Sequence, residues 1–110
     1  MEDCIFCKII KGEIPSKKVY ESDDVIAFHD IHPSADLHIL VVPKEHLGGI
    51  INLDDKHSKL LSKIYQAVNQ LVVENNLKDN VYRVVVNGGK AQIVPHLHFH
   101  LLGGKWRKFV

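Results

Sequence analysis

HLHFHLLGG, residues 96–104, decides the fold, because imidazole and hydrocarbon side chains alternate in it up to a pair of glycines. In an extended strand, side chains two residues apart share one face. One face then carries three histidines, His96, His98 and His100. The other face carries Leu97, Phe99 and Leu101. The pattern predicts a strand over residues 96–102, ended by Gly103 and Gly104, with an apolar face against a core and a row of histidines opposite.

Outside this run, β-branched and aromatic residues mark four more strands, and helical spacing marks two helices. The predicted strands are Lys18–Glu21, Val25–His29, Leu37–Val42 and Val81–Val86, of which the first two form a hairpin. The predicted helices are a short one over residues 4–11 and a long amphipathic one from Asp54 or Asp55 to about Asn75. Leu37–Val42 is apolar on both faces and is expected at the centre of the sheet. Together they predict an α+β fold, in which a five-stranded, mainly antiparallel sheet is covered by the long helix and joined by a short N-terminal helix.

The composition is that of one ordinary globular domain spanning residues 1–110, with 45% hydrophobic and 25% charged residues. A domain of this size buries little surface, so pairing with a second copy is expected. With 14 Lys and Arg against 13 Asp and Glu, the net charge is only +1, which argues against nucleic acid or a membrane surface as a partner. We see no signal segment, and two closely spaced cysteines cannot form a disulfide framework, so we expect a cytoplasmic location.

The row of three histidines can be explained without any function, or by one of two functions. A histidine-rich chain can alternate by chance, or carry polar residues on a half-solvated strand. Otherwise the row holds a metal ion, or one ring is a nucleophile while the others orient it and bind an anion. Metal-dependent hydrolysis would need a carboxylate base, and residues 87–110 contain no acidic residue. An anionic substrate fits better, because neutral imidazole attacks phosphorus at pH 7 and its phosphoramidate is readily hydrolysed.

The run from His96 to Gly104 resembles the histidine triad motif, in which three histidines alternate with apolar residues, followed by the Gly-Gly of the HINT branch. Further segments resemble that family in the same order, namely Cys4–Ile10, Ile14–Ser16, Ala27–Ile31 and Val42–His46. The resemblance covers almost the whole chain, from Cys4 to Gly104. It implies a homodimer whose sheets join edge to edge, with the long helix and the strand Val81–Val86 at the interface.

The resemblance also implies a role for each matching residue. His98 would be the nucleophile that becomes nucleotidylated, His100 would hydrogen-bond the α-phosphate, and His38 would belong to the same histidine network. Asp30 would bind the ribose hydroxyls, although a turn-capping role explains this residue equally well when it is considered alone. The remaining positions are Phe28 and Ile31 as walls of the base pocket, Asn87 near the phosphate, and Gln92 shaping its loop.

Cys4 and Cys7 form a Cys-x-x-Cys pair that indicates zinc only weakly, because two small buried thiols are the ordinary alternative. The resemblance supplies two further ligands. It implies a structural zinc held by a closed set of four side chains, Cys4, Cys7, His46 and His96. A closed set has no open position for substrate, so no catalytic metal is expected.

One position departs from the HINT pattern. Members commonly carry Ser or Thr directly after the loop Gln, where the hydroxyl helps to protonate a leaving amine, but this chain has Ile93. Phosphoramidate cleavage would then be slow, or another leaving group would be used. Trp106 also lies outside the Trp-Pro-Pro-Gly tail of that branch. The sequence predicts a hydrolase or transferase acting at the α-phosphate of purine nucleotide conjugates, of the purine nucleoside phosphoramidase type; the alternative is a nucleotide-binding regulatory module with little turnover.

Overall fold

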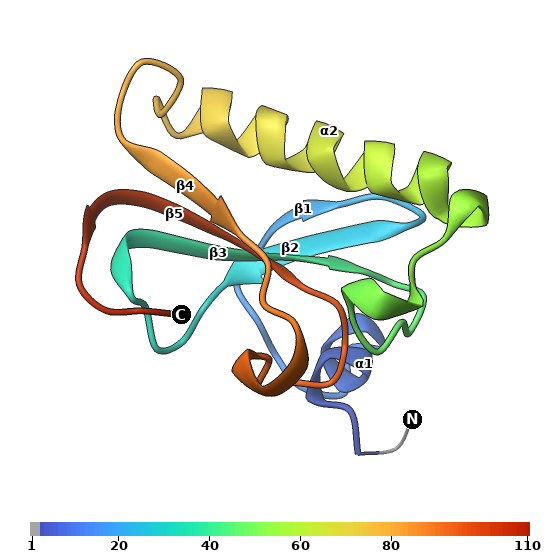
Figure 1. Ribbon diagram of the computed structural model, residues 1–110. Helices are drawn as coiled ribbons and strands as arrows, with labels where there is room; N and C mark the ends of the chain where they lie inside the picture. The colour runs from blue at the N-terminus through green and yellow to red at the C-terminus, as the bar shows by residue number, and fades with distance from the viewer. Residues whose placement is uncertain (1–2) are drawn as a thin grey trace.

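The computed structural model describes residues 3–110 as a five-stranded sheet with a long helix on one face (Figure 1). The strands are β1 (Lys18–Glu21), β2 (Val25–His29), β3 (Ala35–Pro43), β4 (Tyr82–Val85) and β5 (Phe99–Trp106). Their order in the sheet is β1-β2-β3-β5-β4, and every neighbouring pair is antiparallel. The helices are α1 (Ile5–Ile10) and α2 (Ser58–Glu74), with 3-10 turns at Ile50–Asn52, Asp55–His57 and Gly89–Ala91. The predicted α+β fold is confirmed, including the central place of β3.

The sheet separates two apolar clusters, because successive side chains of a strand point to opposite faces. Toward α2, alternate residues of β2, β3 and β5 pack against the helix: Val25, Ala27, Ile39, Val41, Phe99 and Leu101. Toward α1, the intervening residues Ile26, Phe28, Leu40 and Val42 pack against Phe6 and the two cysteines. In Figure 1, α2 lies above the sheet, whereas α1 and the C-terminal segment lie below it. The histidines of β3 and β5 point to this lower face.

Helix α2 covers the upper face through apolar residues three and four positions apart. Its buried residues are Ile64, Ala67, Val68, Leu71 and Val72, as the periodicity predicts. The Asp54 side chain accepts a hydrogen bond from the Lys56 N–H at the 3-10 turn that leads into the helix. The chain leaves the helix through Asn76, whose φ of 58° is the left-handed conformation common after a helix end. Neither α1 nor α2, the two α-helices of residues 3–110, is long and apolar enough to cross a bilayer.

The last strand differs from the prediction at both ends. It begins at Phe99, not at residue 96, because the Leu97 N–H donates to the Leu47 carbonyl and so is not available to β3. It continues past the two glycines to Trp106, which pairs with Ala35 at the start of β3. Gly104, with φ of 76°, lies where the register between these strands shifts, so the glycine marks a bulge and not a strand end.

Candidate functional site

His98 and His100 lie in a cavity of about 380 Å³ on the face of the sheet that carries α1. The two imidazole rings meet edge to face, with centroids 5.0 Å apart. Other lining residues come from the loop after β2, from β3, from the loop after β4 and from the C-terminal segment. Among them are Asp30, His38, Asn87, Ile93, Lys108 and Phe109. The structure therefore brings together five of the residues named from the sequence, His98, His100, His38, Asp30 and Asn87.

The ring of His98 is held in one tautomer by the main chain. Its Nδ1 lies 2.7 Å from the His96 carbonyl oxygen, which only accepts hydrogen bonds, so Nδ1 carries the proton. Neutral imidazole then has an unprotonated Nε2 with a free lone pair. The ring of Phe6 packs edge-on against this imidazole, with centroids 5.1 Å apart, and fixes its plane. This arrangement is the one that a histidine nucleophile requires.

His100 is oriented by a relay of hydrogen bonds that begins at the main chain of the β2–β3 loop. The Ser34 N–H donates to Nδ1 of His38 over 2.9 Å, so the proton of His38 is on Nε2. That Nε2 lies 2.9 Å from Nδ1 of His100, which must accept. The proton of His100 is therefore on its own Nε2, a buried atom without a hydrogen-bond partner among residues 3–110. A buried, unpaired N–H donor in a cavity is suited to bind an anionic oxygen.

Burial keeps these three rings neutral at pH 7. Removal from water lowers the pKa of His38 and of His98 below the usual value of 6.5. For His100 burial, reinforced by the neighbouring rings of His98 and His38, lowers the pKa to about 4. The cavity thus presents neutral imidazoles, in which protons and lone pairs occupy defined nitrogens.

Asp30 lies at the edge of the cavity and makes two contacts. Its Oδ1 accepts a hydrogen bond from the His32 N–H over 2.8 Å, which is the turn-capping role considered above. Its Oδ2 lies 3.5 Å from Nε2 of His38. Asp30, His38 and His100 together have the donor types of a metal site. However, the Ser34 N–H occupies the Nδ1 lone pair of His38 and leaves a proton on Nε2, where a metal would need a lone pair.

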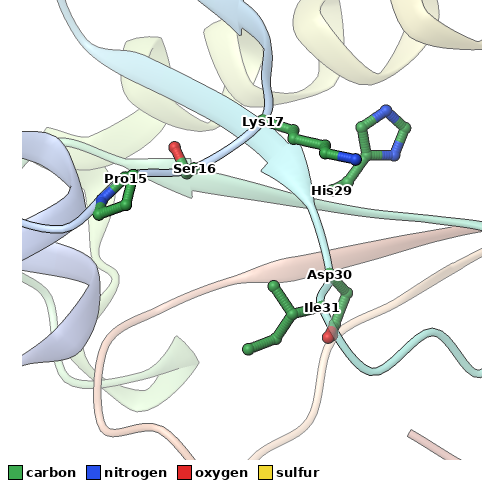
Figure 2. A pocket seen from close by; sticks show the side chains of 6 residues that line it. All are labelled: Pro15, Ser16, Lys17, His29, Asp30 and Ile31. Atoms are coloured by element: carbon green, nitrogen blue, oxygen red, sulfur yellow. The ribbon is translucent and has the colours of Figure 1, made fainter.

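A second cavity, of about 660 Å³, lies on the other side of Asp30. Figure 2 shows the six side chains that line it: three from the segment before β1, one from the end of β2 and two from the loop that follows β2. They are Pro15, Ser16, Lys17, His29, Asp30 and Ile31. Ile31 is 84% exposed and offers an apolar surface there. Asp30 is the residue shared by the two cavities.

Phe28 and Gln92 lie outside both sets of lining residues. Phe28 is buried under Phe6, in an edge-to-face contact with centroids 5.7 Å apart, so it supports the ring that packs on His98. The Gln92 amide donates to the carbonyls of Gly48 and Val94, over 2.6 and 2.9 Å. It therefore ties the loop after β3 to the segment that leads into β5.

Below the sheet, the side chains of Cys4, Cys7, His46 and His96 converge, with their four donor atoms within 4.8 Å of one another. Cys4 caps α1 by accepting the Cys7 N–H on its sulfur, which places the two thiols side by side. The Leu97 N–H bond to Leu47 brings the other two ligand positions together. These residues form a group that could hold a metal ion.

The donor set comes close to what a tetrahedral zinc ion needs, in its spacing and in the tautomer of His96. Nδ1 of His96 lies 3.3 Å from the Cys4 sulfur, 3.6 Å from the Cys7 sulfur and 3.1 Å from Nδ1 of His46. Zinc bond lengths of about 2.0–2.3 Å imply ligand separations of roughly 3.3–3.8 Å in a tetrahedron. Nε2 of His96 donates to the Pro43 carbonyl over 2.8 Å, so Nδ1 is left with the lone pair that a metal needs.

His96 belongs to both clusters. Its ring points to the cysteines, and its carbonyl accepts the Nδ1 proton of His98. Burial lowers the pKa of His96 and raises that of the Cys7 thiol. The candidate metal group and the candidate nucleophile are therefore joined through one residue.

Three residues at the site have no role in the prediction from the sequence. Phe6 is one apolar residue of a helical pattern, and Ser34 contributes only its N–H. Lys108 lies beyond Gly104, where the motifs that resemble the family end. Each reaches the site through contacts between distant parts of the chain, which local patterns do not record. A basic residue just beyond the predicted last strand was the only available signal for Lys108.

The chain is similar in sequence and in fold to known proteins. A family model described as scavenger mRNA decapping enzyme, C-terminal binding, matches residues 3–108. A 14 kDa zinc-binding protein of Zea mays is 44% identical over 105 residues, 92% of this chain and 81% of the relative. The crystal structure of a HIT (histidine triad) family hydrolase from Legionella pneumophila superposes with a TM-score of 0.91 at 39% identity, covering 97% of each chain. A histidine triad nucleotide-binding protein from Candida albicans superposes with a TM-score of 0.81 at 38% identity, covering 98% of this chain and 85% of the other.

Proposed function

This chain belongs to the histidine triad family, and from that premise we propose that it hydrolyses purine nucleotide conjugates, such as nucleoside phosphoramidates, through a nucleotidyl intermediate on His98. The observation that carries the proposal is the pair of tautomers at the cavity. Nε2 of His98 has a free lone pair because Nδ1 is hydrogen-bonded to the His96 carbonyl. Nε2 of His100 has a free N–H because Nδ1 accepts from His38. A nucleophile and an anion-binding donor therefore lie next to each other.

The reaction has two steps. In the first, Nε2 of His98 attacks the α-phosphorus; the nitrogen–phosphorus bond forms as the bond to the leaving group breaks, and its electrons depart with that group, which takes up a proton from water when it is an amine. In the second, water attacks the same phosphorus and loses a proton to the solvent, and the electrons of the nitrogen–phosphorus bond return to Nε2. The product is a nucleoside monophosphate. The N–H of His100 would stabilise the charge on the non-bridging phosphate oxygens in both steps.

The two cavities support a nucleotide that extends past Asp30. Its phosphate would lie with His98, His100 and Asn87. Its base would lie against Ile31 in the second cavity, and the Asp30 carboxylate between them suits the ribose hydroxyls. Phe28 would act indirectly, by supporting the Phe6 ring that packs against His98, and Gln92 would act by fixing its loop. A purine would cover more of the exposed Ile31 side chain than a pyrimidine would.

We also propose that the group of two cysteines and two histidines holds a structural zinc ion. The Zea mays relative is named a zinc-binding protein. The four donors are all protein side chains, so no position is left for substrate, and a bound ion would tie α1 to the segment that leads into β5. The ion would fix the backbone at His96, whose carbonyl holds the His98 ring.

A homodimer is the proposed assembly. Strand β4 is an edge of the sheet, and its neighbourhood exposes apolar side chains that a second copy would cover. They are Val81, Tyr82 and Val84 near the edge, with Tyr65 and Val73 on α2. Sedimentation at micromolar concentration should show a dimer; a monomer alone would contradict this part of the proposal.

Trapping the intermediate tests the function. Protein mixed with a purine nucleoside phosphoramidate and quenched in alkaline denaturant should gain the mass of one nucleotidyl group, on the peptide that contains His98. His98→Ala should form no adduct while still binding the nucleoside monophosphate. His57→Asn is the matched control, since it removes a buried imidazole outside the cavity and keeps an acceptor for the Asp54 N–H. Absence of any adduct, or an adduct that persists in His98→Ala, would overturn the proposal.

A further inference from the structure

Arg107 fastens the C-terminal segment to the start of β3, and in Figure 1 this segment ends beside the loop between β2 and β3. Its guanidinium donates to the Ala35 carbonyl and to the Asp36 carboxylate, each over 2.7 Å. Its N–H donates to the Ser34 carbonyl, also over 2.7 Å. Arg107 therefore binds three consecutive positions of the chain.

The C-terminal segment is shaped to receive the Asp36 side chain. The second carboxylate oxygen of Asp36 accepts a hydrogen bond from the Lys105 N–H over 2.8 Å. Gly104 lies against the same carboxylate, where a Cβ atom would come within 2.7 Å of Oδ2. With φ of 76°, Gly104 also has a conformation that residues with a side chain rarely adopt. Glycine at this position allows the contact that Arg107 completes.

The residues that Arg107 binds lie just before His38 and include the first donor of the histidine relay. Ser34 is 4% exposed, and its N–H donates to Nδ1 of His38. Among residues 3–110, this N–H is the only hydrogen-bond partner of that nitrogen. Two groups contact the other nitrogen, Nε2: Nδ1 of His100 at 2.9 Å and the Asp30 carboxylate at 3.5 Å. The place of the proton on His38 therefore depends on the position of Ser34.

A displaced Ser34 would allow the relay to reverse. Without a donor at Nδ1, the proton of His38 would be free to lie on Nδ1, and Nε2 would then accept from His100. The proton of His100 would lie on its own Nδ1, and its Nε2 would present a lone pair to the cavity, which repels an anionic oxygen. The Asp30 carboxylate near Nε2 of His38 opposes this reversal, so both forms would be populated.

We propose that Arg107 is a positioning residue for the reaction. By holding the chain at Ser34 it keeps the Ser34 N–H on His38, and so keeps the proton of His100 on Nε2, the nitrogen that would meet the phosphate. The effect on rate rests on the proposed function, whereas the place of each proton does not. The Arg107–Asp36 pair is half-exposed and adds little to stability, so its removal should leave the protein folded.

The place of each proton can be observed without substrate. In zinc-supplemented protein labelled with [15N]histidine, the signals of the ring nitrogens report which nitrogen is protonated. In the unchanged protein, Nε2 of both His38 and His100 should be protonated. Arg107→Met keeps the main-chain contact to Ser34 but loses the guanidinium, so both rings should become mixtures of the two tautomers. Arg107→Lys keeps a cation for Asp36 and should recover most of the original pattern.

Kinetics and binding give a second readout. With a purine nucleoside phosphoramidate, Arg107→Met should lower kcat about tenfold or more, a part of the loss on the order of 10²- to 10³-fold that follows removal of a donor to developing charge. Binding of the nucleoside monophosphate should weaken, whereas binding of the nucleoside, which lacks the phosphate, should be unchanged. Lys63→Met is the matched control, because Lys63 also forms a half-exposed pair, with Asp24, but lies on α2 across the sheet; it should change no readout.

Three results would overturn the inference. The first is an unchanged set of ring signals in Arg107→Met. The second is an equal weakening of nucleoside and monophosphate binding, which a merely structural role would produce. The third is an effect of the same size in Lys63→Met. If the unchanged protein forms no adduct on His98, the proposed function fails, while the ring signals still decide the part played by Arg107.

Discussion

Acid should destabilise the folded protein through His100, and the size of the effect follows from its burial. The ring is 7% exposed, and its pKa falls from 6.5 to about 4 on folding. Above pH 6.5 the ring is neutral in both states and contributes no pH dependence. As the pH falls from 6.5 toward 4, the unfolded chain binds a proton that the folded chain refuses, so stability is lost over this interval. At pH 5 the two pKa values give a loss of about 2 kcal/mol relative to pH 8.

The measurement is the free energy of unfolding in urea at pH 8, 7, 6 and 5, for the unchanged protein and for His100→Asn. The single tryptophan, Trp106, reports unfolding by its fluorescence. Both proteins keep the cysteines, His46 and His96, so losses from metal release are shared and cancel in the difference. The difference in stability should therefore shift by about 2 kcal/mol in favour of the variant between pH 8 and pH 5.

A difference between the two proteins that stays constant with pH would refute the reasoning, because His100 would then titrate alike in the folded and unfolded states. A shift in the opposite direction would mean that the folded cavity stabilises the protonated ring. That result would also remove the argument that His100 offers a neutral N–H donor to phosphate.

Three other outcomes are expected. Removing metal by chelation, or replacing Cys4 with Ser, should open α1 first, so that limited proteolysis cuts near the N-terminus before the sheet; a first cut elsewhere would contradict a structural role for the metal. Leu71→Ala should lower the free energy of unfolding by about 2–5 kcal/mol, whereas Lys59→Ala on the exposed face of α2 should change it by less than about 0.5 kcal/mol, and equal losses would contradict the packing of α2. Ile93→Ser should raise the single-turnover rate on a purine phosphoramidate roughly tenfold or more, because a hydroxyl can assist proton transfer; negligible turnover in both proteins would favour a nucleotide-binding module.

The elements of the fold could be predicted because their signals are local. The spacing of apolar residues in 58–74 identifies the face of α2 that the structure buries. The apolar run around Ile39 indicates a central strand, and β3 is central. The predicted start of the last strand, at residue 96, was wrong. The observed start depends on the hydrogen bond between Leu97 and Leu47, which are 50 positions apart, and no local pattern contains that contact. Glycine is ambiguous in the same way, since Gly104 serves equally in a turn and in a bulge.

The candidate site could be predicted in part, for a similar reason. Alternation is enough to place His98 and His100 on one face, and the resemblance adds His38 and Asp30. The tautomers could not be predicted, because they depend on carbonyl and N–H groups of His96 and Ser34 that every residue type possesses. Lys108 could not be found either, since its place in the lining of the cavity depends on how Arg107 binds Ala35 and Asp36.

Because His96 belongs to both clusters, the metal content of a preparation should affect its activity. One residue faces the candidate metal group with its ring and holds the nucleophile with its main chain, so partial metal loading divides the molecules into two populations. With substrate in excess, formation of the proposed intermediate on His98 in such a sample would follow a sum of two exponentials, whose amplitudes follow the metal content. Specific activity compared between batches is therefore meaningful only when each batch is accompanied by its metal-to-protein ratio.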